Sequence, residues 1–338
     1  MTKRLWPIAR TDLFRGASAL PLVGHEAVWF DTVMSVGRGG SLEAFALKDL
    51  DEGDRQRLST LRPPICGLSM DRPRIMGILN VTPDSFSDGG QLATVEAALE
   101  RARAMAEVAD ILDIGGESTR PGAGEVPIDE EIRRTVPIIA AIREAGISTP
   151  ISIDTRKAGV ADAALRAGAN IVNDVSALGF DPDMAGVVAD WDVPVCLMHA
   201  IGSPDTMQND PRYDDVLLDV LDHLERRIAI ATAAGIKRER IILDPGIGFG
   251  KTLHHNVSLL RGMALFHDMG LPVLLGASRK RFIGTLGGAE VPSERLPGSL
   301  SVALHAASQA IQILRVHDTV ETRQAMSLHR AMIGTEQI

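Results

Sequence analysis

Short apolar segments that alternate with longer amphipathic ones constrain the fold of this chain more than any other feature. Eight segments have the length and composition of buried strands: 74–81, 111–116, 150–155, 170–175, 194–199, 241–246, 272–277 and 311–318. The stretches between them carry apolar residues at helical spacing, as in 95–109, 131–146 and 214–235. Repeated β/α units over about 250 residues predict an α/β protein with a (β/α)8 TIM barrel.

A doubly wound open sheet is the alternative that the same alternation allows. No GxGxxG pattern follows the first apolar segment, which weakens a dinucleotide-binding fold. The segment 244–252, DPGIGFGKT, superficially resembles a phosphate-binding loop, but Pro245 occupies the position of the first glycine of that motif. We therefore expect the barrel and no P-loop.

The composition limits the classes of partner and the compartment. A formal net charge of −9 over 338 residues disfavours a nucleic-acid-binding surface. No segment approaches the roughly 18 consecutive apolar residues of a membrane span, and the first residues lack the apolar core of a signal peptide. Cys66 and Cys196 lie in apolar runs, which excludes a disulfide scaffold and a Cys-rich metal site. We expect a cytoplasmic protein that binds small molecules, with no nucleic-acid or membrane partner.

Residues 1–70 differ from the rest and are expected to form an N-terminal extension, with the barrel over 71–338. Segment 27–36 alternates weakly and ends in a glycine-rich turn, which favours a strand. The charged stretch 43–61 favours a helix, and the prolines within 62–74 are typical of a linker. We expect the extension to be a strand plus a helix packed on the barrel.

Polar side chains follow nearly every apolar segment, at the point where each predicted strand ends. They are Asn80, Glu117, Ser118, Thr119, Arg120, Asp154, Asn173, Asp174, His199, Asp244, Ser278, Arg279, Lys280, Arg315 and His317. Any one of them is equally well explained as a helix N-cap or turn residue. Because the active site of a TIM barrel lies at the carboxyl ends of its strands, we expect several of them to converge on one ligand.

These residues divide into two chemical groups. Asp154, Asn173, Asp244 and Lys280 supply acceptors and donors that suit a flat heterocycle with N–H donors on its edge. Asn80, Thr119, Arg120, Ser278, Arg315 and His317 supply donors for a phosphate or diphosphate, and Asn80 can ligate a hard metal. Phe249 is expected to be exposed and to stack on an aromatic substrate. The glycine-rich segments 80–90 and 115–126 are candidates for lids over the site.

The motifs of the chain match those of a known family in order and spacing. They are NVTPDSFSDGG, DIGGESTRPGA, SIDT, IVNDVSAL, DPGIGFGK, GASRKRFIG and RVHD, and over about 74–330 the chain resembles the dihydropteroate synthase family. The resemblance implies a folate-pathway transferase and sulfonamide target. Such an enzyme joins 6-hydroxymethyl-7,8-dihydropterin diphosphate to 4-aminobenzoate, giving 7,8-dihydropteroate and diphosphate, with Mg2+. It also implies a homodimer built by the last helices.

The resemblance also implies roles for individual residues. The pterin is held by Asp154, Asn173, Asp244 and Lys280; the diphosphate by Asn80, Thr119, Arg315 and His317, with Asn80 also holding the metal; and the 4-aminobenzoate by Arg120, Pro121, Phe249 and Ser278. Asp154, Lys280, Arg315 and His317 are expected to be catalytic. One departure from the family pattern is Ala200, which follows Met198 and His199 where a methionine is usual.

Two other functions remain open from the sequence. A methyltetrahydrofolate-type methyltransferase shares the ring-binding carboxylates, but NVTPDSF, ESTRPG and RVHD are motifs for a diphosphate and an arylamine. A catalytically silent pterin-binding protein is the other alternative, although every expected site residue is present. Release of diphosphate that depends on an arylamine distinguishes the synthase from both.

Overall fold

The computed structural model of the chain describes residues 3–25, 27–81, 91–118, 124–202 and 206–334. The barrel strands are β6 (Arg74–Asn80), β7 (Ile111–Gly115), β8 (Ile151–Asp154), β9 (Ile171–Asp174), β10 (Val195–Met198), β11 (Ile241–Asp244), β12 (Leu274–Leu275) and β13 (Ile313–Val316). The helices around them are α2 (Gln91–Ala106), α3 (Ile128–Glu144), α4 (Ala158–Arg166), α5 (Met184–Trp191), α6 (Val216–Ala233), α7 (Leu253–Arg261), α8 (Arg281–Gly287), α9 (Leu296–Ser308) and α10 (Thr319–Met332). Short 3-10 helices lie at η4 (Arg238–Arg240), η5 (Met263–Met269) and η6 (Pro292–Arg295).

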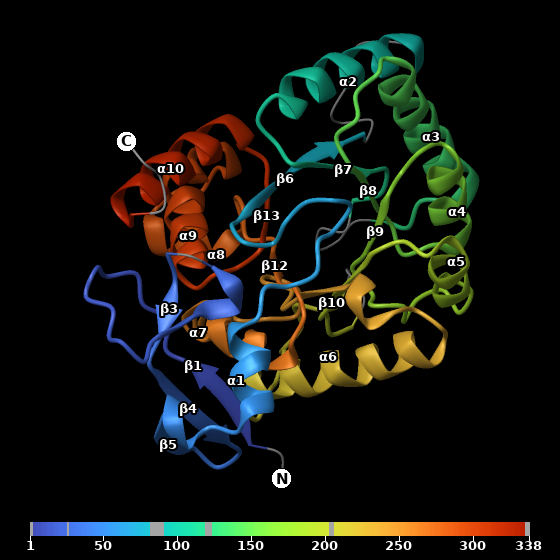
Figure 1. The fold of residues 1–338 in the computed structure, drawn as a ribbon. Coiled ribbons are helices and arrows are strands. Elements are labelled where there is room, and N and C mark those ends of the chain that lie inside the picture. Colours follow the sequence, from blue (N-terminus) through green and yellow to red (C-terminus); the bar gives the residue numbers. More distant parts are fainter. Residues whose placement is uncertain (1–2, 26, 82–90, 119–123, 203–205, 335–338) are drawn as a thin grey trace.

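The eight strands form one parallel sheet in the order β11-β10-β9-β8-β7-β6-β13-β12, with the helices arranged around it (Figure 1). A parallel bridge between Leu243 and Val273 brings the two edges of this sheet together and closes the barrel. The predicted TIM barrel is therefore confirmed. Each strand lies within the apolar segment that predicted it.

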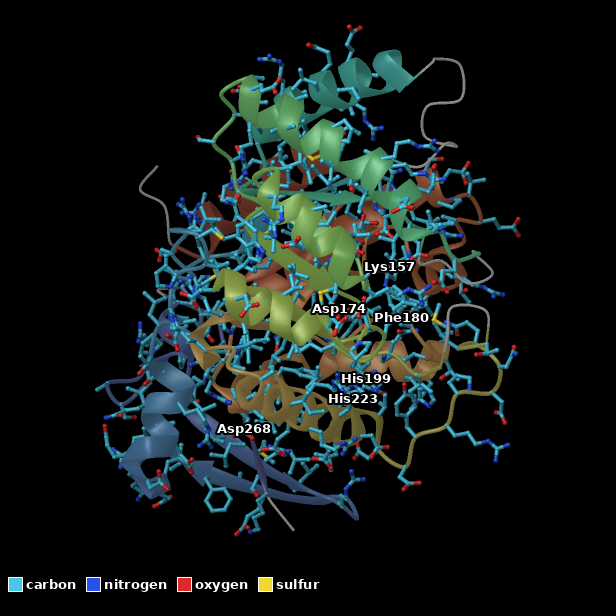
Figure 2. The ribbon with its side chains drawn as sticks, turned by 90° about the vertical axis from the view of Figure 1, so that its right-hand side faces the viewer. Lys157, Asp174, Phe180, His199, His223 and Asp268 are labelled. Carbon is cyan, nitrogen blue, oxygen red and sulfur yellow. The ribbon has the colours of Figure 1, made fainter. Side chains whose placement is uncertain are left out.

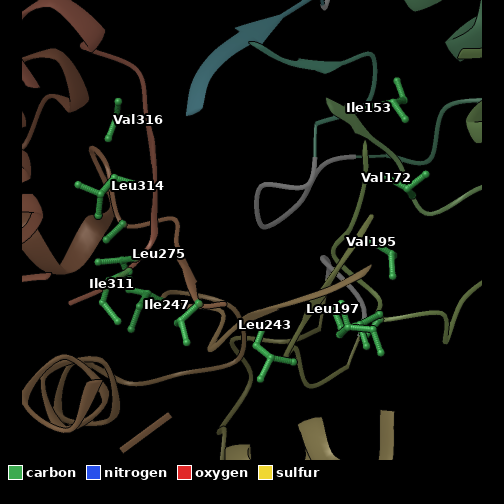
Figure 3. Packing of buried hydrophobic residues seen from close by; sticks show 14 of the residues in the cluster. Ile153, Val172, Val195, Leu197, Leu243, Ile247, Leu275, Ile311, Leu314 and Val316 are labelled. Atoms are coloured by element: carbon green, nitrogen blue, oxygen red, sulfur yellow. The ribbon is translucent and has the colours of Figure 1, made fainter. Parts of the chain in front are cut away.

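Alternation along the strands separates the core into two parts. Side chains that point outward, such as Ile153, Val172 and Leu314, pack against the surrounding helices (Figure 3). Inward-pointing side chains at the amino ends of the strands form a separate apolar cluster, which includes Met76, Ile111, Ile171, Cys196, Ile242, Leu274 and Ile313. This layer fills the lower half of the barrel, so the space for polar side chains lies at the carboxyl ends of the strands.

The segment 62–74, expected as a linker, also fills the bottom of the barrel. Ile65 and Leu68 pair through both backbone hydrogen bonds, of 3.1 and 2.9 Å, around a turn in which Cys66 and Gly67 have positive φ. Ile65 and Met70 are fully buried in the same cluster as the inward-pointing strand residues.

Ile65→Ala should lower the free energy of unfolding by about 2–5 kcal/mol, because it leaves a cavity in this cluster that its neighbours fill only in part. Urea denaturation of the variant measures the loss. A change of less than about 0.5 kcal/mol would mean that Ile65 contributes little to the apolar cluster at the bottom of the barrel.

The N-terminal part of the chain forms a small antiparallel unit of its own. Its elements are β1 (Arg4–Pro7), β2 (Leu20–Pro21), η1 (Leu22–Gly24), β3 (Trp29–Phe30), β4 (Thr32–Gly37), β5 (Ser41–Ala46), η2 (Leu47–Asp49) and α1 (Glu52–Ser59). The order β1-β4-β5 makes a three-stranded sheet, and β2 pairs with β3. The expected strand over 27–36 is present as β3 and β4, which are separated by Asp31.

The helix expected over 43–61 is correct only for its second half. Residues 41–46 instead pair with β4 in register from Ser41 opposite Gly37 to Ala46 opposite Thr32. The helix begins after Asp51, whose carboxylate accepts a hydrogen bond of 2.7 Å from the amide of Asp54. Cross-strand pairing therefore decides the structure of a stretch whose charge pattern favours a helix.

The N-terminal unit packs against the barrel beside α6 (Figure 1). Its apolar core includes Ala264 and Ala310 of the barrel. Arg4, which is buried, donates to Asp222 and Glu225 on α6 at 2.9 and 2.6 Å. These contacts attach the unit firmly to the outside of the barrel. Within the described part of the chain, no helix combines the length and apolarity that crossing a bilayer requires.

Candidate active site

The mouth of the barrel is lined by polar side chains that point inward above the apolar layer. They are Asp113 on β7, Ser152 and Asp154 on β8, Asn173 on β9, Asp244 on β11 and Arg315 on β13. All except Arg315 are buried. Four of them, Asp154, Asn173, Asp244 and Arg315, are residues that the sequence singled out, and the strand register brings them to one place.

Arg315 lies between two carboxylates. Its Nε donates to Oδ2 of Asp113 at 2.6 Å, and one of its terminal nitrogens donates to Oδ2 of Asp154 at 2.6 Å. Charge-assisted hydrogen bonds of this length are strong and fix the guanidinium in place. Sequence reasoning missed Asp113, although a carboxylate inside the apolar run ILDIGG is a signal that could have found it.

Burial raises the pKa of Asp154 to about 7, against the opposing effect of Arg315 and with a further contribution from Asp113. Among the described residues, Oδ1 of Asp154, Oδ1 of Asp113 and Oγ of Ser152 are buried without a hydrogen-bond partner. Unsatisfied buried acceptors are costly, so their presence together at the barrel mouth suits a ligand that brings N–H donors.

Asp244 and Lys280 meet at the opposite side of the mouth. Oδ1 of Asp244 accepts a hydrogen bond of 2.7 Å from the amide of Gly246, and burial raises the pKa of this carboxyl. Burial lowers the pKa of Lys280 to about 7, although Asp244 opposes this. The ammonium of Lys280 donates to the carbonyl of Ile247 and lies 4.0 Å from the ring centroid of Phe249.

Phe249 was expected to be exposed, and it is half-buried instead. The reason is that Lys280 covers one face of its ring. A Cβ on Gly248 would lie 2.9 Å from Cδ of Lys280, so the glycine gives the lysine stem its space. The residue as a whole keeps part of its surface exposed.

Ser278 and His317 lie together at the ends of the last two strands. Oγ of Ser278 accepts from the backbone amide of His317 at 3.2 Å and lies 3.0 Å from Nδ1 of the same residue. This pair fixes the orientation of the imidazole. The neighbouring Arg279 forms an ion pair with Asp318 and belongs to the packing of this end of the barrel.

Asn80 ends β6 beside Gly115. A Cβ at Gly115 would lie 3.8 Å from Oδ1 of Asn80 and 3.6 Å from Oδ2 of Asp154, so the glycine leaves space between them. Thr119, Arg120 and Pro121 lie outside the described residues, as do the central residues of both predicted lids.

Several strand-end residues stabilise turns and loops instead of lining the barrel mouth. Such turn and cap roles are the other explanation that the sequence allows for these residues. The carboxylate of Asp174 accepts hydrogen bonds of 2.7 Å from the amides of Ser176 and Leu178. Glu117 accepts from Val126 at 2.9 Å and lies 3.1 Å from the ammonium of Lys157, a buried residue that the sequence did not single out. Figure 2 labels Lys157 and Asp174 among the side chains of the molecule.

The comparisons with known proteins agree with this site. The family model "Pterin binding enzyme" matches residues 76–317. The dihydropteroate synthase of Escherichia coli K12 is 46 % identical over 271 residues, which cover 80 % of this chain and 95 % of that protein. The chain belongs to the dihydropteroate synthase family of pterin-binding enzymes. Its activity is that of a transferase in folate biosynthesis.

Solved structures of the dihydropteroate synthase family match the barrel. The Xanthomonas albilineans enzyme with 4-aminobenzoic acid has a TM-score of 0.74 and 48 % sequence identity, covering 80 % of this chain and 96 % of its own. The same enzyme in complex with 7,8-dihydropteroate has a TM-score of 0.72 and 46 % identity, covering 80 % and 97 % of the two chains. The family assignment therefore rests on sequence and fold together.

Proposed function

We propose that the barrel mouth of this chain joins 6-hydroxymethyl-7,8-dihydropterin diphosphate to 4-aminobenzoate, with the pterin on the carboxylates that converge there. The observation that carries this proposal is the group formed by Arg315, Asp113 and Asp154, with Asp244 and Lys280 facing it. Buried acceptors without donors match the N–H groups of a pterin edge. The 4-aminobenzoic acid and 7,8-dihydropteroate bound to the Xanthomonas enzyme support the same assignment.

In the proposed pterin site, Asp154, Asn173 and Asp244 accept from the ring N–H donors while Lys280 donates to a ring acceptor. Asp154 lies on the next strand from Asn173, where their Cα atoms are paired. Its carboxylate stabilises the positive charge that develops on the pterin as the leaving group departs.

The leaving diphosphate is proposed to face Arg315 and His317, with Asn80 and Thr119 beside it. The bond between the pterin methylene carbon and the bridging oxygen breaks, and its electron pair leaves with the diphosphate. Arg315 and His317 stabilise the negative charge on that oxygen. The lone pair of the arylamine then forms the C–N bond, and the nitrogen loses a proton to solvent.

Mg2+ fits this arrangement as an ion shared with the substrate. Asn80 offers one hard amide oxygen, and Mg2+ commonly takes one or two protein ligands together with phosphate oxygens and waters. Among the described residues, no three His, Cys, Asp or Glu side chains form a metal cage. We propose that Asn80 holds the ion, which when bound neutralises charge on the leaving diphosphate.

The 4-aminobenzoate is proposed to lie against the Phe249 ring and near Ser278, bordered by Arg120 and Pro121. Because Ser278 also fixes His317 at 3.0 Å, this residue links the arylamine side of the site to the diphosphate side. The arylamine is a weak base, so its attack requires no strong general base.

We also propose a division into a unit over 1–70 and a barrel over 71–338, with 62–70 contributing to both. A homodimer through the last helices is supported by exposed apolar side chains on α8 and α10, namely Leu286, Val320, Leu328 and Met332. A cytoplasmic location is supported by the free thiols Cys66 and Cys196.

Diphosphate release tests the proposed function. The protein is supplied with dihydropterin diphosphate and Mg2+, with and without 4-aminobenzoate. We expect release that depends on the amine, with dihydropteroate as the product. Bound pterin without any release would contradict the proposal and would favour the methyltransferase or the silent binder.

A further inference from the structure

Segment 246–250, which carries Phe249, is fixed by hydrogen bonds from side chains to its backbone carbonyl groups. Each carbonyl from Gly246 to Gly250 accepts a hydrogen bond from a side chain. The donors are Lys251 to Gly246 at 2.8 Å, Lys280 to Ile247, Gln208 to Gly248 at 2.6 Å, Lys251 to Phe249 at 2.9 Å and Tyr213 to Gly250 at 2.8 Å. The glycines at 246, 248 and 250 all have positive φ, so the backbone follows a path that side-chain-bearing residues rarely adopt.

Lys251 is the centre of this arrangement and is buried, with 3 % of its surface exposed. Besides two carbonyls of the segment, its ammonium lies 2.9 Å from Nδ1 of His199 and 3.3 Å from the carbonyl of the same residue. No carboxylate of the described residues contacts it within ion-pair distance. Burial of an amine against neutral acceptors is costly, and it lowers the pKa of Lys251 well below the usual range.

His199 completes the support from the end of β10. Burial, together with the nearby Lys251, lowers the pKa of His199 to about 2, so the ring is neutral, and its Nδ1 lies at hydrogen-bond distance from the amine of Lys251. The rings of His199 and His223 form a T-shaped pair with their centroids 4.7 Å apart, and Figure 2 labels the two residues beside each other. A Cβ on Gly246 would lie 1.9 Å from the carbonyl of His199, so the segment and the strand end touch directly.

We propose that Lys251 is a positioning residue that fixes segment 246–250, and through it places the Phe249 ring and the Ile247 carbonyl for the arylamine and for Lys280. This role rests on the proposed function, because Phe249 and Lys280 are its site residues. Lys251 lies beneath the segment and does not itself touch the substrate. A packing role would not require a buried amine, whereas fixing two carbonyls and an imidazole from one point does.

The first test compares Lys251→Met with Lys251→Arg and with the control Ile65→Ala. Methionine keeps the stem and removes every donor, arginine keeps donors and charge, and Ile65 lies at the opposite end of the barrel. We expect Lys251→Met to lower kcat/KM for 4-aminobenzoate about 100-fold, as small displacements at a reacting site do. Lys251→Arg should recover part of this loss, and Ile65→Ala should leave kcat and KM unchanged.

A double-mutant cycle with Phe249→Ala shows whether Lys251 acts through the segment. In the Phe249→Ala background, Lys251→Met should raise KM for 4-aminobenzoate far less than it does in the native chain. The reason is that both substitutions remove the same contact between the Phe249 ring and the arylamine. Strictly additive effects on kcat/KM would overturn the proposal.

Amide hydrogen exchange measures the position of the segment without reference to activity. The amides of Gly246, Gly248 and Phe249 donate to Asp244, Asn256 and Gly246. In Lys251→Met these amides should exchange at least about tenfold faster while those of β11 do not change. Unchanged exchange at 246–250 would overturn the proposal.

Tyr213→Phe keeps the proposal testable if Lys251→Met does not fold. It removes one donor to the carbonyl of Gly250 and should raise KM and segment exchange by about two- to tenfold, the effect of one hydrogen bond. Wild-type exchange and KM in this variant would then overturn the proposal. If the native enzyme forms no dihydropteroate, the proposed function fails, and the exchange experiment alone decides the positioning role.

Discussion

Arg315→Ala should lower turnover about 1000-fold and the free energy of unfolding by about 3–5 kcal/mol. The first effect follows because the variant loses the guanidinium that we place opposite the leaving diphosphate. The second follows because Asp113 and Asp154, both buried and both bonded to Arg315 at 2.6 Å, are left facing each other without a cation. Pterin affinity should fall much less than turnover, since Asp244 and Lys280 remain.

The loss of stability should depend on pH in a defined direction. The pKa of Asp154 is about 7 in the native protein, above the ordinary value, so its carboxyl stabilises the fold at acid pH and this contribution is lost as the pH rises through 7. Arg315 opposes that loss. Without it the pKa of Asp154 rises further, so the variant should be closest to the native protein near about pH 5 and furthest from it near about pH 8.

Urea denaturation at the two pH values and steady-state turnover measure these effects. Arg279→Ala is the matched control, because it removes another arginine–carboxylate pair at the neighbouring strand end, where Arg279 is partly exposed to solvent. It should cost about 1 kcal/mol or less, with little dependence on pH in this range. Native stability in Arg315→Ala would contradict the contribution of its bonds to Asp113 and Asp154, and native turnover would contradict its proposed catalytic role.

Asp244→Ala should weaken pterin binding about 10- to 100-fold, because a charge-assisted hydrogen bond to a buried carboxylate contributes about 1.5–3 kcal/mol. Oδ1 of Asp244 is bonded to the amide of Gly246, and among the described residues no donor bonds its Oδ2. The variant therefore loses a ligand acceptor and also the contact that ties segment 246–250 to β11.

Calorimetric titration with a pterin carboxylic acid measures this affinity, and Asp174→Asn is the matched control. Asp174 also ends a barrel strand and is buried, but its oxygens are bonded to the turn over Ser176 and Leu178. We expect the control to lose stability and to keep its pterin affinity. Equal affinities for Asp244→Ala and the native protein would contradict the pterin assignment.

The barrel was predictable because it depends on local patterns. Apolar runs of strand length, separated by helical periodicity, allow few architectures, and all eight observed strands lie inside the predicted runs. Four of the six polar residues described at the mouth were also predictable, because strand ends in a barrel face one rim. Asp154, Asn173, Asp244 and Lys280 needed no more than this rule.

Other features depend on contacts between distant parts of the chain, which a local pattern does not contain. Asp113 stands out in its apolar run, but the partner that gives it a role, Arg315, lies 202 residues away. Asp174 is a different case: it follows Asn173 directly, and the local alternation of the strand alone places the two side chains on opposite faces. Residues 43–46 became a strand because β4 offers a pairing edge, and Ile65 became part of the core because the barrel bottom is open to it.

A crystal structure of this protein with 7,8-dihydropteroate tests the central claim most directly. We predict that the pterin ring lies in the barrel mouth, with Oδ2 of Asp244 and the side chains of Asn173 and Lys280 hydrogen-bonded to its edge, and that the aminobenzoate ring contacts Phe249. A product molecule bound elsewhere, or a pterin held in the mouth without Asp244 and Lys280, would contradict the account.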